Sequence, residues 1–99
     1  MKSNIKSNTE AEIILDEVFD FKKVDEFRSA YEEMSDKNFS TLCISFEATK
    51  YMDSSALGML LNVQSFYKDK GVTVKITNTK NQIKKILAIS RFDKRFEID

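Results

Sequence analysis

The stretch "YMDSSALGMLL" (residues 51–61) places an aspartate and two adjacent serines directly before an apolar run. A serine in front of an apolar helix is a normal N-cap, because its side chain accepts a hydrogen bond from an unpaired backbone N–H. Neither Ser54 nor Ser55 is followed three residues later by Glu or Gln, so the pair does not form a capping box. Capping therefore explains one serine and leaves the other for a different role.

The residues after the serine pair predict a helix. Apolar residues continue to Tyr67, and Gly71 stands where a C′ glycine would close a helix over residues 54–70. The segment before the pair, "TLCISFEA" (41–48), alternates apolar and small polar residues and predicts a strand. Cys43 and Ser45 are small enough to sit under a covering helix, so we expect both faces of this strand to be buried.

Further segments alternate between strand and helix patterns on either side. "EIILDEVF" (12–19) and "VTVKIT" (72–77) are short and rich in β-branched residues, which predicts two more strands. The apolar spacing from residue 24 to residue 34 predicts an amphipathic helix that Asp20 starts and "SDKN" ends. A last helix is predicted over 81–90, with Ile83, Ile86 and Leu87 facing inward, and Phe92 and Phe96 are predicted core anchors.

The order of these segments predicts one α/β domain over residues 1–99. We expect a mixed sheet of four to five strands with helices packed on it. Residues 1–10 are polar apart from Ile5 and are expected to be either a loose end or a short edge strand. The chain has 99 residues, a length typical of a single domain.

Composition excludes several classes of function. Histidine is absent and Cys43 is the one cysteine, which excludes Ser-His-Asp and Cys-His nucleophiles, a Cys/His zinc site and an internal disulfide. Formal net charge is zero, so the overall field favours neither nucleic acid nor an anionic membrane. There is no apolar run long enough to span a bilayer and no signal-peptide core. We therefore expect a cytoplasmic protein with no catalytic residues, metal or cofactor.

Charge is divided unevenly along the chain. Residues 10–36 hold ten Asp/Glu and three Lys/Arg, whereas residues 80–95 hold six Lys/Arg and one Asp. Two solvated faces of opposite sign explain this pattern, and partner docking at one or both faces is the alternative. Nucleic-acid binding by the basic segment is not favoured, because its aromatics are predicted to lie in the core.

Phosphorylation of one serine would make this stretch a switch. A helix N-terminus favours a phosphate by about 0.3–2 kcal/mol, and the adjacent Asp53 would oppose it, so the fold should survive the modification. At an interface, a phosphate about 4 Å from a partner's carboxylate costs about 4 kcal/mol or more at an effective dielectric of 20. That cost lowers affinity about a thousandfold. The added charge could therefore abolish a contact without deforming the domain.

"YMDSSALGMLL" resembles the D-S-S-G-L-G signature of STAS domains, the sulfate transporter and anti-sigma factor antagonist family. The resemblance extends from the strand before the signature to "KKILAISRFDKRFEI" and covers nearly the whole chain. It is greatest for the small single-domain anti-sigma factor antagonists of bacteria, especially a branch whose first helix is introduced by "FDF" (residues 19–21). This sequence departs from the commonest pattern at Ala56, where glycine is usual, so the turn after the serines should be stiffer.

The resemblance implies a STAS fold and a partner-switching mechanism. It makes Ser54 the phosphate acceptor, Asp53 the flanking acid and Ser55 a support for the helix start. The implied partners are an anti-sigma factor or a serine kinase of the histidine-kinase ATPase type, and a PP2C-type serine phosphatase. The unphosphorylated form would bind an anti-sigma factor or another regulator, and the phosphorylated form would release it. The protein is expected to be a monomer or a weak homodimer.

The rest of the long helix divides into a core side and a possible partner side. Leu57, Leu60, Leu61 and Val63 are predicted core residues. Met59, Asn62 and Phe66 lie on another flank, which forms a partner surface if it is exposed, with Met59 as an adaptable anchor. The predicted partner-binding residues are Met52, Asp53, Ser54, Ser55, Met59, Asn62 and Phe66.

Three alternatives stay open at this point. Asp53 could accept a phosphoryl group as in a receiver domain, although the chain is shorter than that fold and lacks its acidic pair and lysine in suitable contexts. Some STAS domains bind nucleotides or lipids, so a small-ligand sensor is possible, although there is no glycine-rich phosphate loop. The third alternative is that the serines are never modified and the domain only scaffolds partners. Independently of these, Asp53 could simply be a helix-terminal acid.

Overall fold

The computed structural model describes residues 1–99 and contains one five-stranded sheet, a separate pair of short strands and three α-helices. Short 3₁₀ turns precede α1 and follow α1 and α3. The elements in chain order are β1 (Lys2–Ile5), β2 (Glu10–Ile14), β3 (Val18–Phe19), η1 (Phe21–Lys23), α1 (Val24–Glu33), η2 (Met34–Asp36), β4 (Thr41–Ser45), β5 (Tyr51–Met52), α2 (Ser54–Lys68), β6 (Thr73–Thr77), α3 (Asn81–Ile89), η3 (Phe92–Lys94) and β7 (Glu97–Ile98).

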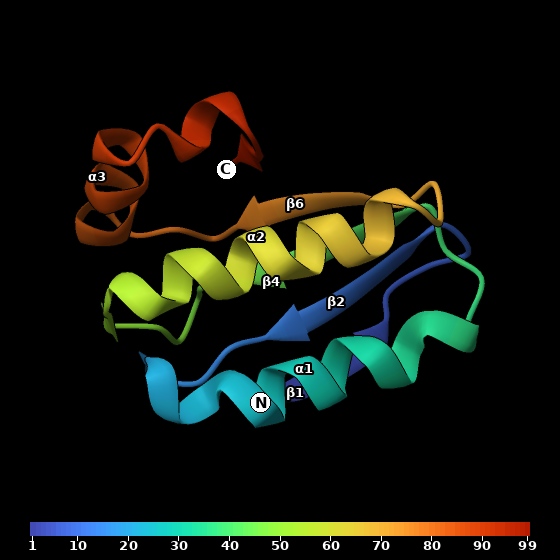
Figure 1. The fold of residues 1–99 in the computed structure, drawn as a ribbon. Coiled ribbons are helices and arrows are strands. Elements are labelled where there is room, and N and C mark those ends of the chain that lie inside the picture. Colours follow the sequence, from blue (N-terminus) through green and yellow to red (C-terminus); the bar gives the residue numbers. More distant parts are fainter.

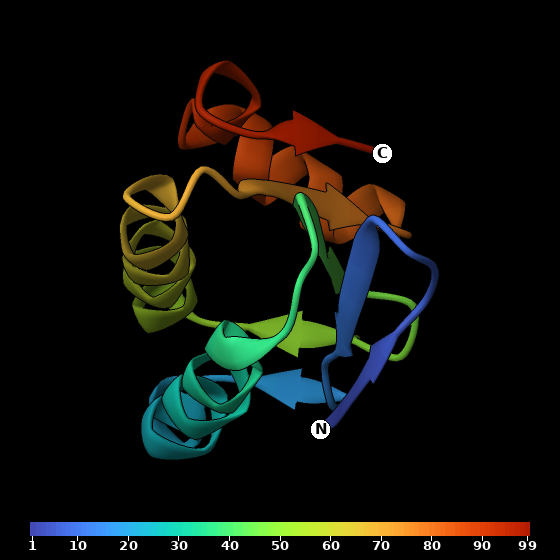
Figure 2. The same cartoon turned by 90° about the vertical axis from the view of Figure 1, so that its right-hand side faces the viewer.

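The main sheet is mixed, with strand order β1-β2-β4-β6-β7. β1 pairs antiparallel with β2, and the other neighbours pair in parallel. Helices α1 and α2 lie together on one face, while α3 lies at the end of the sheet (Figure 1). Figure 2 shows both long helices on the same side of the strands. The mixed α/β architecture predicted from the sequence is confirmed, and residues 2–5 form an edge strand rather than a loose end.

The core lies between the sheet and the two long helices. Ile13, Leu42, Ile44 and Ile76 point into it from the parallel strands. A chain of aromatic side chains fills the space beneath α1, with Phe19 and Phe27 in edge-to-face contact at 5.1 Å between ring centroids. The buried apolar side of α1 is narrow, as the spacing predicted.

The segment 12–19 is two short strands rather than one. The chain leaves the main sheet after Ile14, and β3 pairs with β5 instead. Backbone groups of residues 16 and 17 are occupied by the loop that follows β4, since the hydroxyl of Thr49 donates to the carbonyl of Asp16 and the Lys50 N–H donates to the carbonyl of Glu17. These bonds turn the chain toward the start of α1.

The burial predicted for single residues of β4 and of the chain after β6 is confirmed, except at Ile86. Cys43 and Ser45 are buried, as expected, and burial raises the pKa of the Cys43 thiol. Phe92 and Phe96 are buried core residues whose rings stack. Ile86 is exposed, which makes its predicted inward position wrong, because the short helix α3 buries only the stripe of Ile83 and Leu87.

A polar cluster ties the first strand to the first helix. Asp16 accepts from the amino group of Met1 at 2.7 Å and from Nζ of Lys23 at 3.0 Å. The same amino group lies 3.2 Å from a carboxylate oxygen of Glu26.

No helix in the structure is both long enough and apolar enough to cross a membrane.

Candidate functional site

The serine pair lies at the end of the sheet where the parallel strands finish. β2, β4 and β6 run in the same direction, so the loops that follow them gather at one edge. These loops lead to η1 and α1, to α2 and to α3, and Figure 1 shows the first turns of these helices at the same end of the molecule. The crevice beyond the carboxyl ends of parallel strands is the usual place for function in an α/β protein.

Asp53, rather than a serine, caps helix α2. Its backbone is extended, and its Oδ1 accepts a hydrogen bond from the Ser55 N–H at 2.9 Å. Its Oδ2 accepts from the Phe21 N–H at 3.4 Å. The expectation that one serine caps the helix is therefore wrong. Aspartate is as good an N-cap as serine, so its position just before the helix was a signal for this arrangement.

The two serines are the first two residues of α2. Ser54 is exposed, and Ser55 is half-buried and supplies the backbone N–H that Asp53 binds. Since Asp53 performs the capping, neither hydroxyl is needed for it. Ala56 is fully buried, and its N–H donates to the carbonyl of Asp53 at 3.1 Å. The start of the helix is thus fixed by packing and by the cap, and it presents the Ser54 side chain to solvent.

The predicted partner flank is only partly at the surface. Met52 and Met59 are each 5% exposed and belong to the core. They are therefore not part of the exposed contact surface that was expected. Asn62 is exposed, and Phe66 is half-buried against Tyr31 and Tyr67. On the core side, Leu60 and Val63 are buried as predicted, whereas Leu57 and Leu61 are only half-buried.

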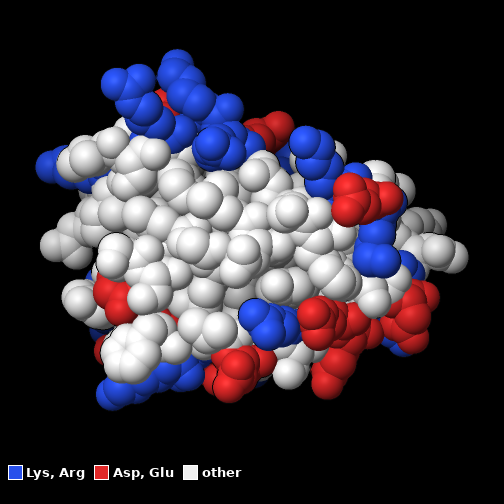
Figure 3. Space-filling model, in the orientation of Figure 1, with Lys and Arg blue, Asp and Glu red and all other residues white.

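The solvent side of α2 is uncharged along most of its length. No charged residue occurs between Ser54 and Tyr67, and the exposed positions are Ser54, Gly58, Asn62 and Ser65. Figure 3 shows this helix as a broad uncharged area, with a group of Lys and Arg above it over the C-terminal segment, and with acidic groups and some basic ones below it along α1. Charged side chains are usually depleted in the centre of a protein interface. The spacing of glycine and uncharged polar residues at 54, 58, 62 and 65 was the sequence signal for this side.

Two exposed aromatic side chains that the sequence analysis did not select lie near the serine pair. Phe21 is 61% exposed and its backbone N–H donates to Asp53. Tyr51 is 57% exposed, precedes the cap by two residues and pairs with Val18 in the small parallel ladder. Large exposed aromatics are enriched among residues that anchor protein partners.

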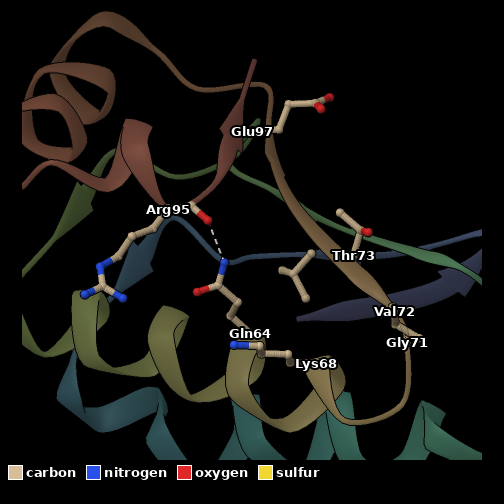
Figure 4. Close-up of a pocket in the computed structure, with 8 residues that line it drawn as sticks. Gln64, Lys68, Gly71, Val72, Thr73, Arg95 and Glu97 are labelled. Atoms are coloured by element: carbon tan, nitrogen blue, oxygen red, sulfur yellow. Dashed lines mark hydrogen bonds between the residues drawn. The ribbon is translucent and has the colours of Figure 1, made fainter.

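The cavities do not form an obvious ligand site. An open cleft of about 570 Å³ lies between the last turns of α2, β6 and the C-terminal segment. In Figure 4 the side chains of Arg95 and Glu97 extend away from each other, and the amide of Gln64 donates to the carbonyl of Arg95 at 2.6 Å. The polar groups therefore do not converge on a common point. The structure contains no group of three or more side chains placed to hold a metal ion.

The sequence profile of the STAS domain matches residues 5–99. A STAS-domain containing protein of Pseudomonas aeruginosa is 35% identical over 80 residues, which cover 81% of this chain and 78% of that protein. The chain belongs to the STAS domain family.

Solved structures share the fold at low sequence identity. A candidate anti-sigma factor antagonist from Thermotoga maritima superposes with a TM-score of 0.85 at 13% identity, covering 98% of this chain and 83% of that one. The anti-sigma factor antagonist SpoIIAA in its unphosphorylated form gives 0.76 at 17% identity, covering 99% and 86%. The Bacillus cell fate determinant SpoIIAA in the phosphorylated form gives 0.74 at 17% identity, covering 99% and 89%. These similarities establish the STAS fold.

Proposed function

We propose that this protein is a phosphorylation-controlled partner-switching regulator. With Ser54 unmodified, it binds an anti-sigma factor or a comparable regulator through the uncharged side of α2 and the residues around Asp53. With Ser54 phosphorylated, it releases that regulator. In this proposal the domain is not an enzyme and transmits a signal in the cytoplasm to transcription or to another regulated output.

The observation that supports the proposal best is the division of labour between Asp53 and Ser54. Asp53 holds the helix start through the Ser55 N–H, and the exposed Ser54 side chain has no part in that bond. A phosphate can therefore be added to Ser54 while the cap stays in place. The helix N-terminus favours the added charge by about 0.3–2 kcal/mol, which offsets repulsion from the neighbouring carboxylate.

The effect on a bound partner is larger than the effect on the fold. A partner that covers Ser54 brings its own groups close to the added phosphate. A single carboxylate about 4 Å away costs about 4 kcal/mol or more at an effective dielectric of 20, or about a thousandfold in affinity. The structural neighbour SpoIIAA is a precedent, because structures of this anti-sigma factor antagonist exist in the unphosphorylated and the phosphorylated form, and both superpose on this chain, with TM-scores of 0.76 and 0.74.

The modifying enzymes follow from the family resemblance. A serine kinase of the histidine-kinase ATPase type would phosphorylate Ser54, and a PP2C-type phosphatase would restore the hydroxyl.

The test is a pulldown with the unmodified protein and with its Ser54→Glu variant, read by mass spectrometry. A regulator captured by the parent and by Ser54→Ala, but lost by Ser54→Glu, supports the proposal. Ser29→Glu is the matched control, since it adds the same charge at an exposed serine on α1 and should retain the regulator. Equal capture by Ser54→Ala and Ser54→Glu would instead identify a scaffold that is not switched.

The receiver-like alternative has its own discriminating measurement. Both carboxylate oxygens of Asp53 accept backbone N–H groups, so its phosphorylation would disrupt the helix start. A phosphoserine survives acid and heat, whereas an acyl phosphate hydrolyses. Acid-labile label that Asp53→Asn removes and Ser54→Ala retains would overturn the assignment of Ser54.

A further inference from the structure

Exposed apolar side chains are concentrated at the end of the molecule that carries Ser54. Six large hydrophobic residues are exposed, and five of them belong to segments at this end: Val18, Phe21, Tyr51, Ile86 and Ile89. Ile89 is 82% exposed, the highest value of the six. We call the exposed surface of residues 15–26, 46–54 and 80–91 the end face. Exposed apolar side chains gathered at one end of a soluble protein indicate an interaction surface.

The contacts of the loops place these segments together. Phe21 is bonded to Asp53 at the start of α2, and Val18 is paired with Tyr51. Nζ of Lys80, just before α3, donates to the carbonyl of Glu47 at 2.6 Å, which joins the third segment to the second. Figure 1 shows the starts of α1 and α2 and the whole of α3 at this end.

The end face has two halves of opposite charge. Residues 15–26 and 46–54 hold seven Asp/Glu and three Lys, a balance of −4. Residues 80–91 hold four Lys/Arg and no acid, a balance of +4. Each half also has exposed apolar groups, the acidic half through Phe21 and Tyr51 and the basic half through Ile86 and Ile89. The halves therefore match each other in charge and in apolar character.

We propose that the end face is the interface of a two-fold symmetric dimer of this protein. In a two-fold interface the same surface is used by both copies, so the basic half of one copy meets the acidic half of the other twice. Ile89 and Ile86 of one copy would pack near Phe21 and Tyr51 of its partner, inside a rim of opposite charges. The surface is self-complementary, which is the requirement for such an interface.

The dimer would compete with the proposed regulator. Ser54 lies within the end face, because it is the first residue of α2 and the last residue of the segment 46–54. A dimer would cover it and keep it from both the kinase and the regulator. This consequence rests on the proposed function, whereas the dimer itself does not and can be tested without any partner.

Sedimentation equilibrium of the whole chain tests the proposal. Measurements run up to about 1 mM protein, where a dimer with a dissociation constant of about 1 mM is detectable. We expect the mass to rise from the 11.5 kDa monomer to twice that value and no further. The dimer should dissociate at least tenfold more readily in about 1 M than in about 0.1 M NaCl, because the Debye length falls from about 10 Å to about 3 Å. A monomer throughout, or masses that keep growing beyond the dimer, would overturn the proposal.

A charge exchange identifies the surface. Lys84→Glu/Lys85→Glu takes the basic half from +4 to 0, and Glu17→Lys/Asp25→Lys takes the acidic half from −4 to 0; all four side chains are exposed. Each variant alone should dimerise at least tenfold more weakly than the parent. An equimolar mixture of the two should recover dimers, because one contact then joins the unchanged +4 and −4 halves and the other places the introduced Glu residues opposite the introduced Lys residues. Lys68→Glu/Lys70→Glu, the same change at the other end of α2, is the control and should dimerise as the parent does. A mixture that stays monomeric contradicts the arrangement.

The apolar contribution has a separate matched pair. Ile89→Ser should weaken the dimer at least tenfold, whereas Ile5→Ser, which removes an exposed isoleucine from the edge strand β1, should leave it unchanged. Because Ile89 is exposed, its replacement should leave the thermal unfolding of the monomer unaltered. Equal dimerisation of both variants would place the interface elsewhere.

Discussion

Asp53 connects two parts of the candidate site through a single side chain. One carboxylate oxygen binds the first turn of α2, and the other binds the backbone of Phe21 before α1. A serine in the same place has a single hydroxyl oxygen. It could not accept from both N–H groups through two separate oxygens, as the carboxylate does. The residue that flanks the proposed phosphorylation site therefore also positions it.

This arrangement predicts different stabilities for replacements of neighbouring residues. Asp53→Ala should lower the free energy of unfolding by about 1–2 kcal/mol, because it removes the N-cap. Asp53→Asn keeps a capping oxygen and should cost less. Ser54→Ala and Ser54→Glu should both remain within roughly 1 kcal/mol of the parent, as surface changes do. Urea denaturation measures all four variants, and a Ser54→Ala loss that exceeds the Asp53→Ala loss would show that the serine is the true cap.

Single residues also show where the sequence analysis was limited. An exposed polar serine before an apolar helix could be recognised, because its pattern is local. The burial of Met59 could not be recognised in this way. Helix α2 packs against α1 as well as against the sheet, so it buries a wider apolar stripe than a helix with one neighbour would. A wide apolar stripe contains residues on both flanks of the helix, so periodicity alone does not show which flank faces solvent.

At the scale of elements, the ends of two helices contrast. Gly71 adopts φ +73° after α2, the Gly71 N–H donates to Lys68, and the Val72 N–H donates to Tyr67. These are the two bonds of a Schellman motif with glycine at C′, as the sequence predicted. After α3 the left-handed position is taken by Arg91, with φ +62°. A side chain with a Cβ is strained in that conformation.

The contrast predicts opposite effects for two substitutions. Gly71→Ala should destabilise the protein by about 1 kcal/mol, entirely through the backbone, because an added Cβ would have no atom within 4 Å. Arg91→Gly should relieve the strain and stabilise by up to about 1 kcal/mol. Thermal or urea unfolding of dilute protein compares the two variants with the parent. Stabilisation by Gly71→Ala, or a clear loss in Arg91→Gly, would contradict this account.

The order of elements could be predicted from the sequence because each has a local pattern and an end signal. The separation of β2 from β3 could not, because it depends on bonds between residues 16–17 and residues 49–50, more than 30 positions apart. The exposure of Ile86 has a similar origin. Only the fold shows that the nine-residue α3 has contacts on one narrow side.

The dependence of stability on pH belongs to the whole molecule, and Asp16 contributes to its acid side. Hydrogen bonds from the Met1 amino group and then from Lys23 hold the pKa of the Asp16 carboxyl below its ordinary value of 3.8, against the opposing effect of burial. A lowered pKa in the folded state gives stability that is present above pH 3.8 and is lost as the pH falls through the folded value. Asp16→Asn should cost about 0.5–1 kcal/mol at neutral pH.

Unfolding measured between neutral pH and about pH 2 checks this contribution. The difference between the parent and Asp16→Asn should shrink as the pH falls. Glu17→Gln is the control, because Glu17 is exposed and forms no ion pair, and its difference from the parent should stay small throughout. A constant gap between the parent and Asp16→Asn down to the lowest pH would exclude an ionic role for Asp16.

Tyr67 provides the alkaline counterpart, because it joins α2 to α1 across the core. Its buried hydroxyl donates to the carbonyl of Tyr31, and burial raises its pKa to about 12 from the ordinary 10.0. The folded state thus requires the neutral phenol, so its contribution is complete below pH 10 and is lost as the pH rises toward 12. Tyr67→Phe should cost about 1–2 kcal/mol at neutral pH, since it leaves the carbonyl without its donor.

That cost should diminish above pH 10 as the parent itself loses stability. Tyr51→Phe, which removes an exposed phenol, should follow the parent over the whole range and is the control for the loss of a tyrosine hydroxyl. The measurement is urea unfolding at a series of pH values from 7 to about 12. If Tyr67→Phe and the parent run parallel up to pH 12, the hydroxyl does not titrate with folding. The bond between the two long helices would then be structural without being a source of alkaline sensitivity.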